Sequence, residues 1–214
     1  MTPRQKDRKD RILKAVLSYV EKHGYEGANI REIAKEAGVS PTTLYNIYGN
    51  KDHLILSAQE QVIASTMEGT IDSEDPVLSF LYRQESIAKI VRDNPNWATA
   101  MLTLTLNAEP GDRATTSGFN TGLSHAMIIC QRMQDGGDLD KSYDIDRMAK
   151  SAMGAIWGVI LFWLKGFIAL HDLERDLKVR VLEALIPFAT PKGLKRLSAL
   201  RQQASGRQLL KATA

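Results

Sequence analysis

Apolar residues recur along most of the chain at intervals of three and four, which is the spacing of one buried helix face. Residues 5–23 carry such a stripe, and Gly24 is placed to end it. The same pattern recurs over residues 77–92, 97–106, 119–133, 143–170 and 173–188. We find no stretch with the apolar–polar alternation that is typical of strands. The pattern therefore predicts an all-α protein.

Residues 29–54 contain two short helical stripes that are separated by a tight turn. Asn29 is placed to cap the first helix, and Gly38 can adopt the left-handed conformation that ends it. Ser40 can cap the second helix, with Pro41 at its first position. The inward residues of the first helix are Ile30, Ile33, Ala34 and Ala37. This segment is therefore predicted to form a helix-turn-helix.

The second short helix has an inward and an outward face. Leu44 and Tyr48 lie four residues apart and are expected in the core. The remaining side chains are mostly small and able to form hydrogen bonds, as required of a helix that enters a major groove and reads base edges. The outward residues are Pro41, Thr42, Thr43, Tyr45 and Asn46. We therefore expect duplex DNA as a partner.

This motif resembles the signature of the tetracycline-repressor (TetR) family of bacterial transcriptional regulators. The resemblance rests on Ile33-Ala34, Ala37-Gly38-Val39-Ser40, Leu44-Tyr45, Tyr48, Lys51 and Leu54. It covers roughly the first quarter of the chain. The chain departs from the family pattern at Tyr48, where phenylalanine is usual, and at Ile47, where a polar or aromatic residue is common.

The resemblance implies a helix-turn-helix domain of three helices over residues 1–53. A larger helical domain for effector binding and dimerisation would follow over residues 54–190, and a basic tail over 191–214. The helix from Lys51 to Glu68 would connect the two domains, with a break from Gly69 to Pro76. The resemblance further implies a cytoplasmic homodimeric repressor, which binds a near-palindromic operator and is released from it by a small apolar effector. A DNA-binding dimer without an effector is the alternative.

Seven side chains around the turn are expected to contact DNA. The two threonines can bond several bases or touch a thymine methyl group. Asn46 suits either an adenine or a phosphate. Asn29 and Lys51 stand at helix starts, which favour anions, and are expected to hold phosphates. The full set is Asn29, Pro41, Thr42, Thr43, Tyr45, Asn46 and Lys51.

The segment 151–170 carries a single charge, Lys165, and is long enough to span a bilayer. Gly154 and Gly158 form a GxxxG step, which lets helices approach closely. Lys165 and the charged residues that follow favour surrounding protein over lipid. We therefore expect a dimer-forming helix rather than a membrane span, with the next helix alongside it. The expected interface residues are Ser151, Gly154, Gly158, Leu161, Lys165, Leu177, Val181 and Leu185.

Large apolar side chains in the predicted larger domain, residues 54–190, are suited to binding an apolar effector. Ordinary core packing is the alternative for each of them. The candidate effector-binding residues are Trp97, Met101, Phe119, Met127, Trp157 and Phe162.

The net charge of +3 is small, but basic residues gather at both ends. Residues 1–14 contain six basic and two acidic side chains, which suits phosphate attraction or, alternatively, a solvated helix face. Residues 191–214 contain six basic residues and no acid, which we interpret as a solvated tail.

The remaining chemistry-bearing residues indicate no catalytic or metal site. The four histidines are far apart in sequence and have no ligand-spaced neighbours. Cys130, the single cysteine, has apolar neighbours that predict a buried thiol and fits a reducing cytoplasm, although a redox role stays open. The charged N-terminus does not resemble a signal peptide. We expect no cofactor and no enzymatic activity; a helical enzyme is the less favoured class.

Overall fold

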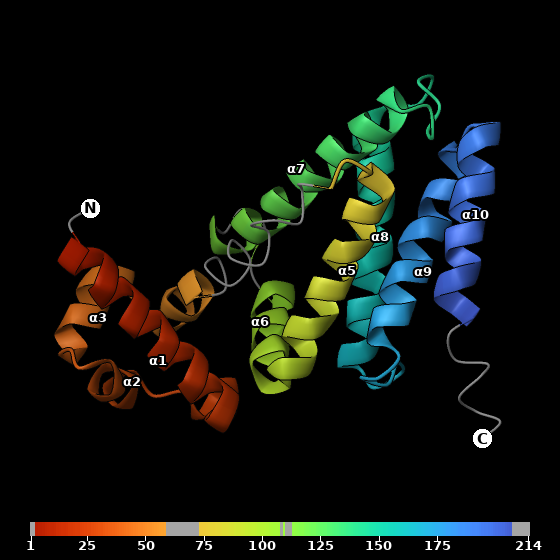
Figure 1. Cartoon of the computed structure of the whole chain (residues 1–214). Helices are drawn as coiled ribbons and strands as arrows, with labels where there is room; N and C mark the ends of the chain where they lie inside the picture. The colour runs from red at the N-terminus through yellow and green to blue at the C-terminus, as the bar shows by residue number, and fades with distance from the viewer. Residues whose placement is uncertain (1–2, 59–72, 108, 110–112, 207–214) are drawn as a thin grey trace. The chain divides into compact units, whose positions relative to one another are not determined.

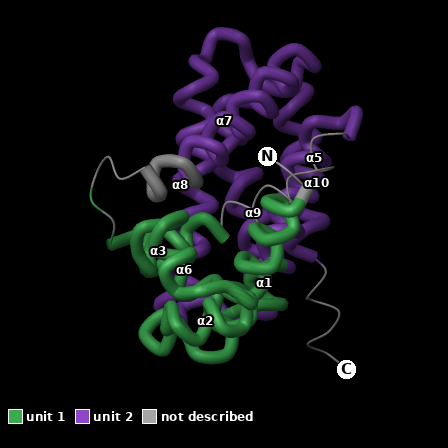
Figure 2. Tube along the Cα trace, turned by 90° about the vertical axis from the view of Figure 1, so that its left-hand side faces the viewer, with its two compact units in different colours: residues 1–66, 90–118 green, residues 67–89, 119–214 purple. Residues whose placement is uncertain are grey.

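The computed structural model describes residues 3–58, 73–107, 109 and 113–206. Within these ranges every extended regular element is a helix, which confirms the all-α prediction. Figure 2 shows two compact units, residues 1–66 with 90–118 and residues 67–89 with 119–214. The α-helices labelled in Figure 1 are α1 (Pro3–Gly27), α2 (Ile30–Ala37), α3 (Pro41–Tyr48), α5 (Pro76–Asp93), α6 (Pro95–Asn107), α7 (Arg113–Asp135), α8 (Ile145–Leu164), α9 (Leu173–Leu185) and α10 (Pro191–Gly206).

The first unit has its core between α1, α2, α3 and the helical residues 51–58. Ile12 and Val16 of α1, Ile33 of α2 and Leu44 of α3 are all buried there. Helices of eight residues such as α2 and α3 are unstable alone in water. Burial of each such side chain contributes about 1.5–3 kcal/mol, so packing against α1 maintains both helices.

Helix α6 joins this first unit through contacts with α1. The Trp97 backbone N–H donates to the Glu21 carboxylate at 2.9 Å, and the Asn96 side chain donates to the Glu21 carbonyl at 2.9 Å. Trp97 and Met101 are buried in the same core as Ile12. The sequence predicts α6 within the larger helical domain of residues 54–190. The helix nevertheless packs against α1, which lies some 75 residues earlier in the chain.

The second unit contains the packed helices α8, α9 and α10. Met148, Ala152 and Ile156 form the buried stripe of α8, while Leu177 and Val181 form that of α9. Asp144 caps α8 by accepting a hydrogen bond from the Arg147 N–H at 2.9 Å. These helices therefore bury their apolar faces against neighbours in the same chain.

Helix α8 ends at Leu164, which corrects the expectation of a helix that continues to Leu170. Lys165 is its C-terminal cap, and the chain turns there because the N–H groups of Lys165 and Gly166 bond back to Leu161 and Trp163. Among the helices described, none combines the length and the apolar character that crossing a bilayer requires.

Residues 191–206 form the helix α10, which corrects the interpretation of this region as a solvated tail. Leu197 is fully buried, and Arg196 forms ion pairs with both Asp138 and Asp75. Asp138 is buried as well, so its charge needs this partner. Residues 207–214 lie outside the described residues, as do residues 59–68 of the predicted connecting helix and 69–72 of the predicted break.

Gly193 lets α10 approach the loop before α8 closely. A Cβ atom at this position would lie 1.8 Å from the Asp138 carbonyl oxygen, so any larger residue must push the helix away. At Gly206, in the same helix, an added Cβ meets no atom within 4 Å.

We predict that Gly193→Ala lowers the free energy of unfolding by about 3 kcal/mol, because the added methyl group overlaps backbone atoms. Urea denaturation followed by circular dichroism measures this change. Gly206→Ala is the matched control and should leave stability within about 0.5 kcal/mol. Equal stability of the two variants would contradict the close approach of α10.

Cys130 of α7 is fully buried, as the sequence predicts, and burial raises the pKa of its thiol to about 12. A thiol is reactive as the thiolate, so the folded protein should react very slowly at pH 8.

We therefore predict that dithiobis(nitrobenzoate) labels Cys130 at pH 8 only as fast as the protein unfolds. The absorbance of released thionitrobenzoate gives the rate, and labelling in 6 M urea provides the control. Complete labelling within seconds without denaturant would show that Cys130 is accessible.

Candidate nucleic-acid interface

The turn between α2 and α3 is formed by the capping residues that the sequence predicts. The Asn29 side chain accepts a hydrogen bond from the Arg31 N–H at 2.9 Å and so caps α2. Gly38 has φ of 66°, in the left-handed region, and ends α2. Ser40 accepts from the Thr43 N–H at 3.1 Å, and Pro41 occupies the first position of α3. These local bonds fix the direction in which α3 leaves the turn.

One face of α3 is buried and the other is open to solvent. Leu44 is buried, and Tyr48 packs partly against the core, where burial raises the pKa of its hydroxyl. Tyr45 is 51% exposed and Ile47 is 47% exposed. Thr42 and Asn46 are also exposed, so this face of α3 presents predicted contact residues to solvent.

Thr43 differs from its neighbours because its side chain already has a partner. Its Oγ1 lies 2.8 Å from Ser40 Oγ, so the two hydroxyls share a hydrogen bond at the helix start. This contact orients the Thr43 hydroxyl while leaving the side chain partly exposed.

Lys51 contacts the segment before α2. Its ammonium donates to the Tyr25 carbonyl at 3.2 Å and lies 4.0 Å from the centre of the Tyr25 ring. The Tyr25 hydroxyl in turn donates to Asp52 at 2.7 Å. Burial, followed by the hydrogen bond to Asp52, raises the pKa of Tyr25 to about 12, so the hydroxyl stays protonated at neutral pH. Lys51 therefore also connects the helical residues 51–58 to the end of α1.

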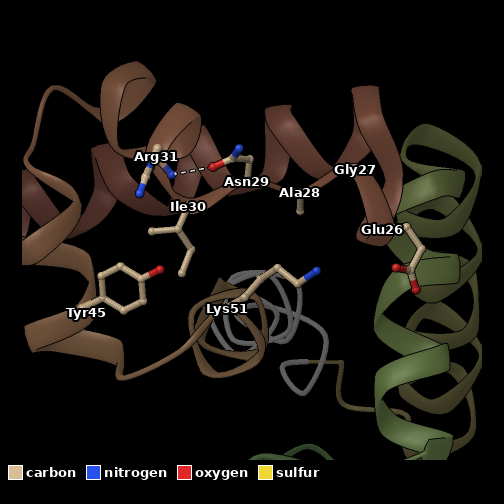
Figure 3. Close-up of a pocket in the computed structure, with 8 residues that line it drawn as sticks. All are labelled: Glu26, Gly27, Ala28, Asn29, Ile30, Arg31, Tyr45 and Lys51. Carbon is tan, nitrogen blue, oxygen red and sulfur yellow. Dashed lines mark hydrogen bonds between the residues drawn. The ribbon is translucent and has the colours of Figure 1, made fainter.

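A pocket of about 380 Å³ opens beside this contact. Figure 3 shows the start of α2, with Asn29 and Arg31, on one side and Tyr45 and Lys51 on the other. The helix start, Arg31 and Lys51 all favour an anion, whereas the Glu26 carboxylate at the pocket edge opposes it. Three predicted contact residues, Asn29, Tyr45 and Lys51, thus line one pocket.

Arg31 was not among the predicted DNA-contacting residues. It is exposed, lines this pocket and follows Asn29 by two positions. A cationic side chain in the first turn of a helix whose start is predicted to hold a phosphate is the sequence signal that could have pointed to Arg31.

A second pocket, of about 540 Å³, lies where the start of α1 meets the end of α3. Arg8 and Lys9 line it together with Ile47 and Tyr48. Arg11, by contrast, donates to the Ala37 carbonyl at 3.2 Å and so caps the end of α2. The basic residues of α1 therefore differ in role, and Arg8 and Lys9 lie beside α3.

The six candidate effector-binding residues divide between the two units. Trp97 and Met101 are buried in the core of the first unit, where they pack near α1. In the second unit Phe119 stacks on Trp157 with ring centres 4.4 Å apart, and Met127 is partly buried. Phe162 is 55% exposed and contacts the ring of Phe167.

The candidate dimer residues also divide into two groups. Leu177, Val181 and Leu185 are buried within the chain, with at most 1% exposed. This finding corrects their assignment to a dimer interface, because α9 turns this stripe toward its own chain. The α8 residues remain available: Gly154 and Lys165 are exposed, and Ser151, Gly158 and Leu161 are partly exposed.

The described residues contain no group of three or more His, Cys, Asp or Glu side chains able to hold a metal ion.

Comparison with known proteins relates this geometry to a family. Residues 12–58 match the family model "Bacterial regulatory proteins, tetR family". The chain is 27% identical over 185 residues to the HTH-type transcriptional repressor KstR of Mycolicibacterium smegmatis, covering 83% of this chain and 88% of that protein.

Solved structures show the same fold. A putative TetR-family regulator from Rhodococcus sp. superposes with a TM-score of 0.69 at 18% identity, covering 84% of this chain and 99% of that one. Thermus thermophilus FadR, a TetR-family repressor solved in complex with lauroyl-CoA, superposes with a TM-score of 0.65 at 21% identity, covering 86% and 97%. The matched helix-turn-helix and the shared fold agree with the exposed face of α3 described above. Residues 12–58 therefore carry the TetR-family DNA-binding motif, and the chain is similar over most of its length to a TetR-family transcriptional repressor.

Proposed function

We propose that the protein is a cytoplasmic repressor that binds a near-palindromic operator as a homodimer and is released by a small effector held in its second unit. The main support for this proposal is the outward face of α3. Its polar side chains are exposed, while Leu44 on the opposite face is buried in the core. The similarity to KstR, which is named a repressor, supports the same direction of control.

In this proposal base edges are read by α3 and phosphates are held on either side of it. Thr42, Tyr45 and Asn46 enter the major groove, and Thr43 contacts it from the helix start. Asn29, Lys51 and Arg31 hold one phosphate at the first pocket. Arg8 and Lys9 hold another at the second pocket. Phosphate contacts position the motif, while base contacts supply sequence preference.

The exposed stripe of α8 supports dimer formation. A Cβ atom added at Gly154 or Gly158 meets nothing within 4 Å inside the chain, so intrachain packing does not require these glycines. Ser151 and Leu161 continue the stripe toward Lys165. We also assign the exposed pair Phe162 and Phe167 to this surface, because neighbouring large apolar groups on a surface typically mark an interface. A two-fold dimer would present two α3 helices to successive major grooves, about 34 Å apart.

An effector would act by favouring a dimer geometry in which the two recognition helices do not match that spacing. Such control requires tighter binding to the DNA-incompetent form. Phe119, Trp157 and Met127 are the effector-binding candidates that lie in the second unit. FadR, the structural neighbour with lauroyl-CoA bound, supports an effector with an apolar portion. A dimer that binds DNA without any effector remains the alternative function.

We predict that Arg31→Gln weakens binding to operator and non-specific duplex DNA by the same factor, about fivefold, because it removes one phosphate contact. Fluorescence anisotropy over a salt series should give a slope of log affinity that is smaller by about 1.

Lys35→Gln is the matched control for Arg31→Gln, since it removes one exposed positive charge from the same helix without touching the pocket. It should retain nearly the wild-type slope. Equal effects of both variants would show general attraction rather than a phosphate site. Absence of salt-dependent DNA binding by the wild-type protein would overturn the proposed function.

We predict that Gly154→Leu converts the protein to a monomer, because the larger side chain prevents close approach of two α8 helices. Sedimentation velocity measures the change in mass. The urea midpoint of the monomer at low concentration should fall little, since the position is open within the chain. Gln202→Leu, which adds an apolar side chain at an exposed site of α10, should remain dimeric. A dimeric Gly154→Leu variant would place the interface elsewhere.

A further inference from the structure

The second unit contains a buried cation that is not paired with any described residue. Arg83 of α5 is only 6% exposed, and no hydrogen bond or ion pair joins its guanidinium to any residue that the structure describes. Burial lowers the pKa of Arg83 to about 10, so the group is still positively charged at neutral pH. A buried charge is normally paired, because removing it from water is costly. The site therefore favours an anion from outside the chain.

A second polar group lies close to this cation. His125 of α7 is partly buried, and its Nδ1 atom is shielded from solvent without a hydrogen-bond partner. Burial, and then the charge of Arg83, lower the pKa of His125, so the ring is neutral at pH 7. A neutral imidazole can donate one hydrogen bond and accept another. It therefore complements Arg83 in holding a charged oxygen.

Gly122 lies beside Arg83, on the same helix as His125. A Cβ atom at Gly122 would lie 3.7 Å from the Arg83 guanidinium and 2.8 Å from the terminal methyl group of Met153. Gly122 precedes His125 by three residues, so both lie on one face of α7. Helices α5, α7 and α8 thus meet at the charged group, where glycine leaves room for the two long side chains.

An apolar wall adjoins the charged end. Phe119 lies one turn before Gly122 on α7, and Trp157 lies one turn after Met153 on α8. Their rings stack with centres 4.4 Å apart. The stacked rings of Phe119 and Trp157 therefore lie about one helical turn from the point where α7 and α8 meet Arg83 of α5.

We infer that Arg83 and His125 form the anion-binding end of the effector site, and that the effector is an amphiphile with a carboxylate or phosphate group attached to an apolar body. The inference rests on the proposed effector-responsive function and specifies the class of ligand. The anionic group pairs with Arg83 and His125, and the apolar body packs against Phe119 and Trp157. This arrangement explains why α5 keeps an arginine at a buried position that would be more stable as an apolar residue.

The test uses the full-length protein without DNA and four ligands with the same ten-carbon chain. Isothermal titration and thermal unfolding are measured with decanoate, decyl phosphate, decan-1-ol and decylamine, each below its micelle concentration. We expect at least one of the two anions to bind and raise the melting temperature, and the alcohol and the amine to bind at least tenfold more weakly. The stronger anion identifies carboxylate or phosphate as the natural group.

Three variants separate a ligand-binding arginine from a structural one. Arg83→Met should lose anion binding at least tenfold, and it should raise the melting temperature of the free protein by about 4 °C because an unpaired charge is removed. Arg83→Lys keeps the charge and should retain part of the affinity. Arg180→Gln, at an exposed arginine of α9, should bind as the wild type does.

Several outcomes would overturn the inference: no binding of either anion, equal binding of decan-1-ol, or unchanged anion affinity in Arg83→Met. A lower melting temperature of Arg83→Met with intact anion binding would show that Arg83 is structural. The proposed function is tested separately, by operator release in fluorescence anisotropy. If the anions bind but never release DNA, the anion site stands and effector control fails. If decan-1-ol releases DNA and the anions do not, effector control stands and the anion site fails.

Discussion

The orientation of α3 depends on the burial of one side chain, Leu44, beneath this eight-residue helix. A helix as short as α3 has too few internal hydrogen bonds to persist alone, so its contact with the core of the first unit maintains it. The same contact determines which side chains face outward. If Leu44 were displaced, Tyr45 and Asn46 would lose their orientation together. In the proposed function, the preference for a DNA sequence is thus a consequence of core packing.

Local bonds then restrict how α3 leaves the turn. Ser40 and Asn29 each satisfy a backbone N–H at a helix start, and Gly38 permits the sharp reversal between the two helices. The contacts of Lys51 with the Tyr25 carbonyl and ring connect the motif to the end of α1. A residue expected only to hold a phosphate therefore also stabilises the motif, and a substitution there combines both effects. The Arg31 side chain makes no hydrogen bond or ion pair with the residues that the structure describes, so a substitution there isolates the phosphate contribution better.

In the second unit, the side chain proposed to bind the ligand departs from the packing that stabilises the core. Its core follows the usual rule of apolar stripes packed face to face, from Met148 on α8 to Val181 on α9. Arg83 departs from that rule, because its buried charge has no partner among the described residues. Asp138, by contrast, is also buried but is paired with Arg196. The contrast distinguishes a charge that completes the fold from one that is available to a ligand.

The amino-acid sequence alone was sufficient to predict the all-helical class, the helix-turn-helix with its caps, and the inward residues of its two short helices. These features depend on spacing and on capping chemistry within a few neighbouring residues, which a linear pattern records. Contacts between distant segments were needed to show that α6 packs on α1, that residues 191–206 form a helix anchored by Arg196, and that the α9 stripe is buried within the chain. An apolar stripe predicts that one face of a helix is buried. It does not predict which other helix, or which other subunit, packs against that face. The same limit concealed Arg83 and His125, because a missing partner becomes visible only when distant helices are placed side by side.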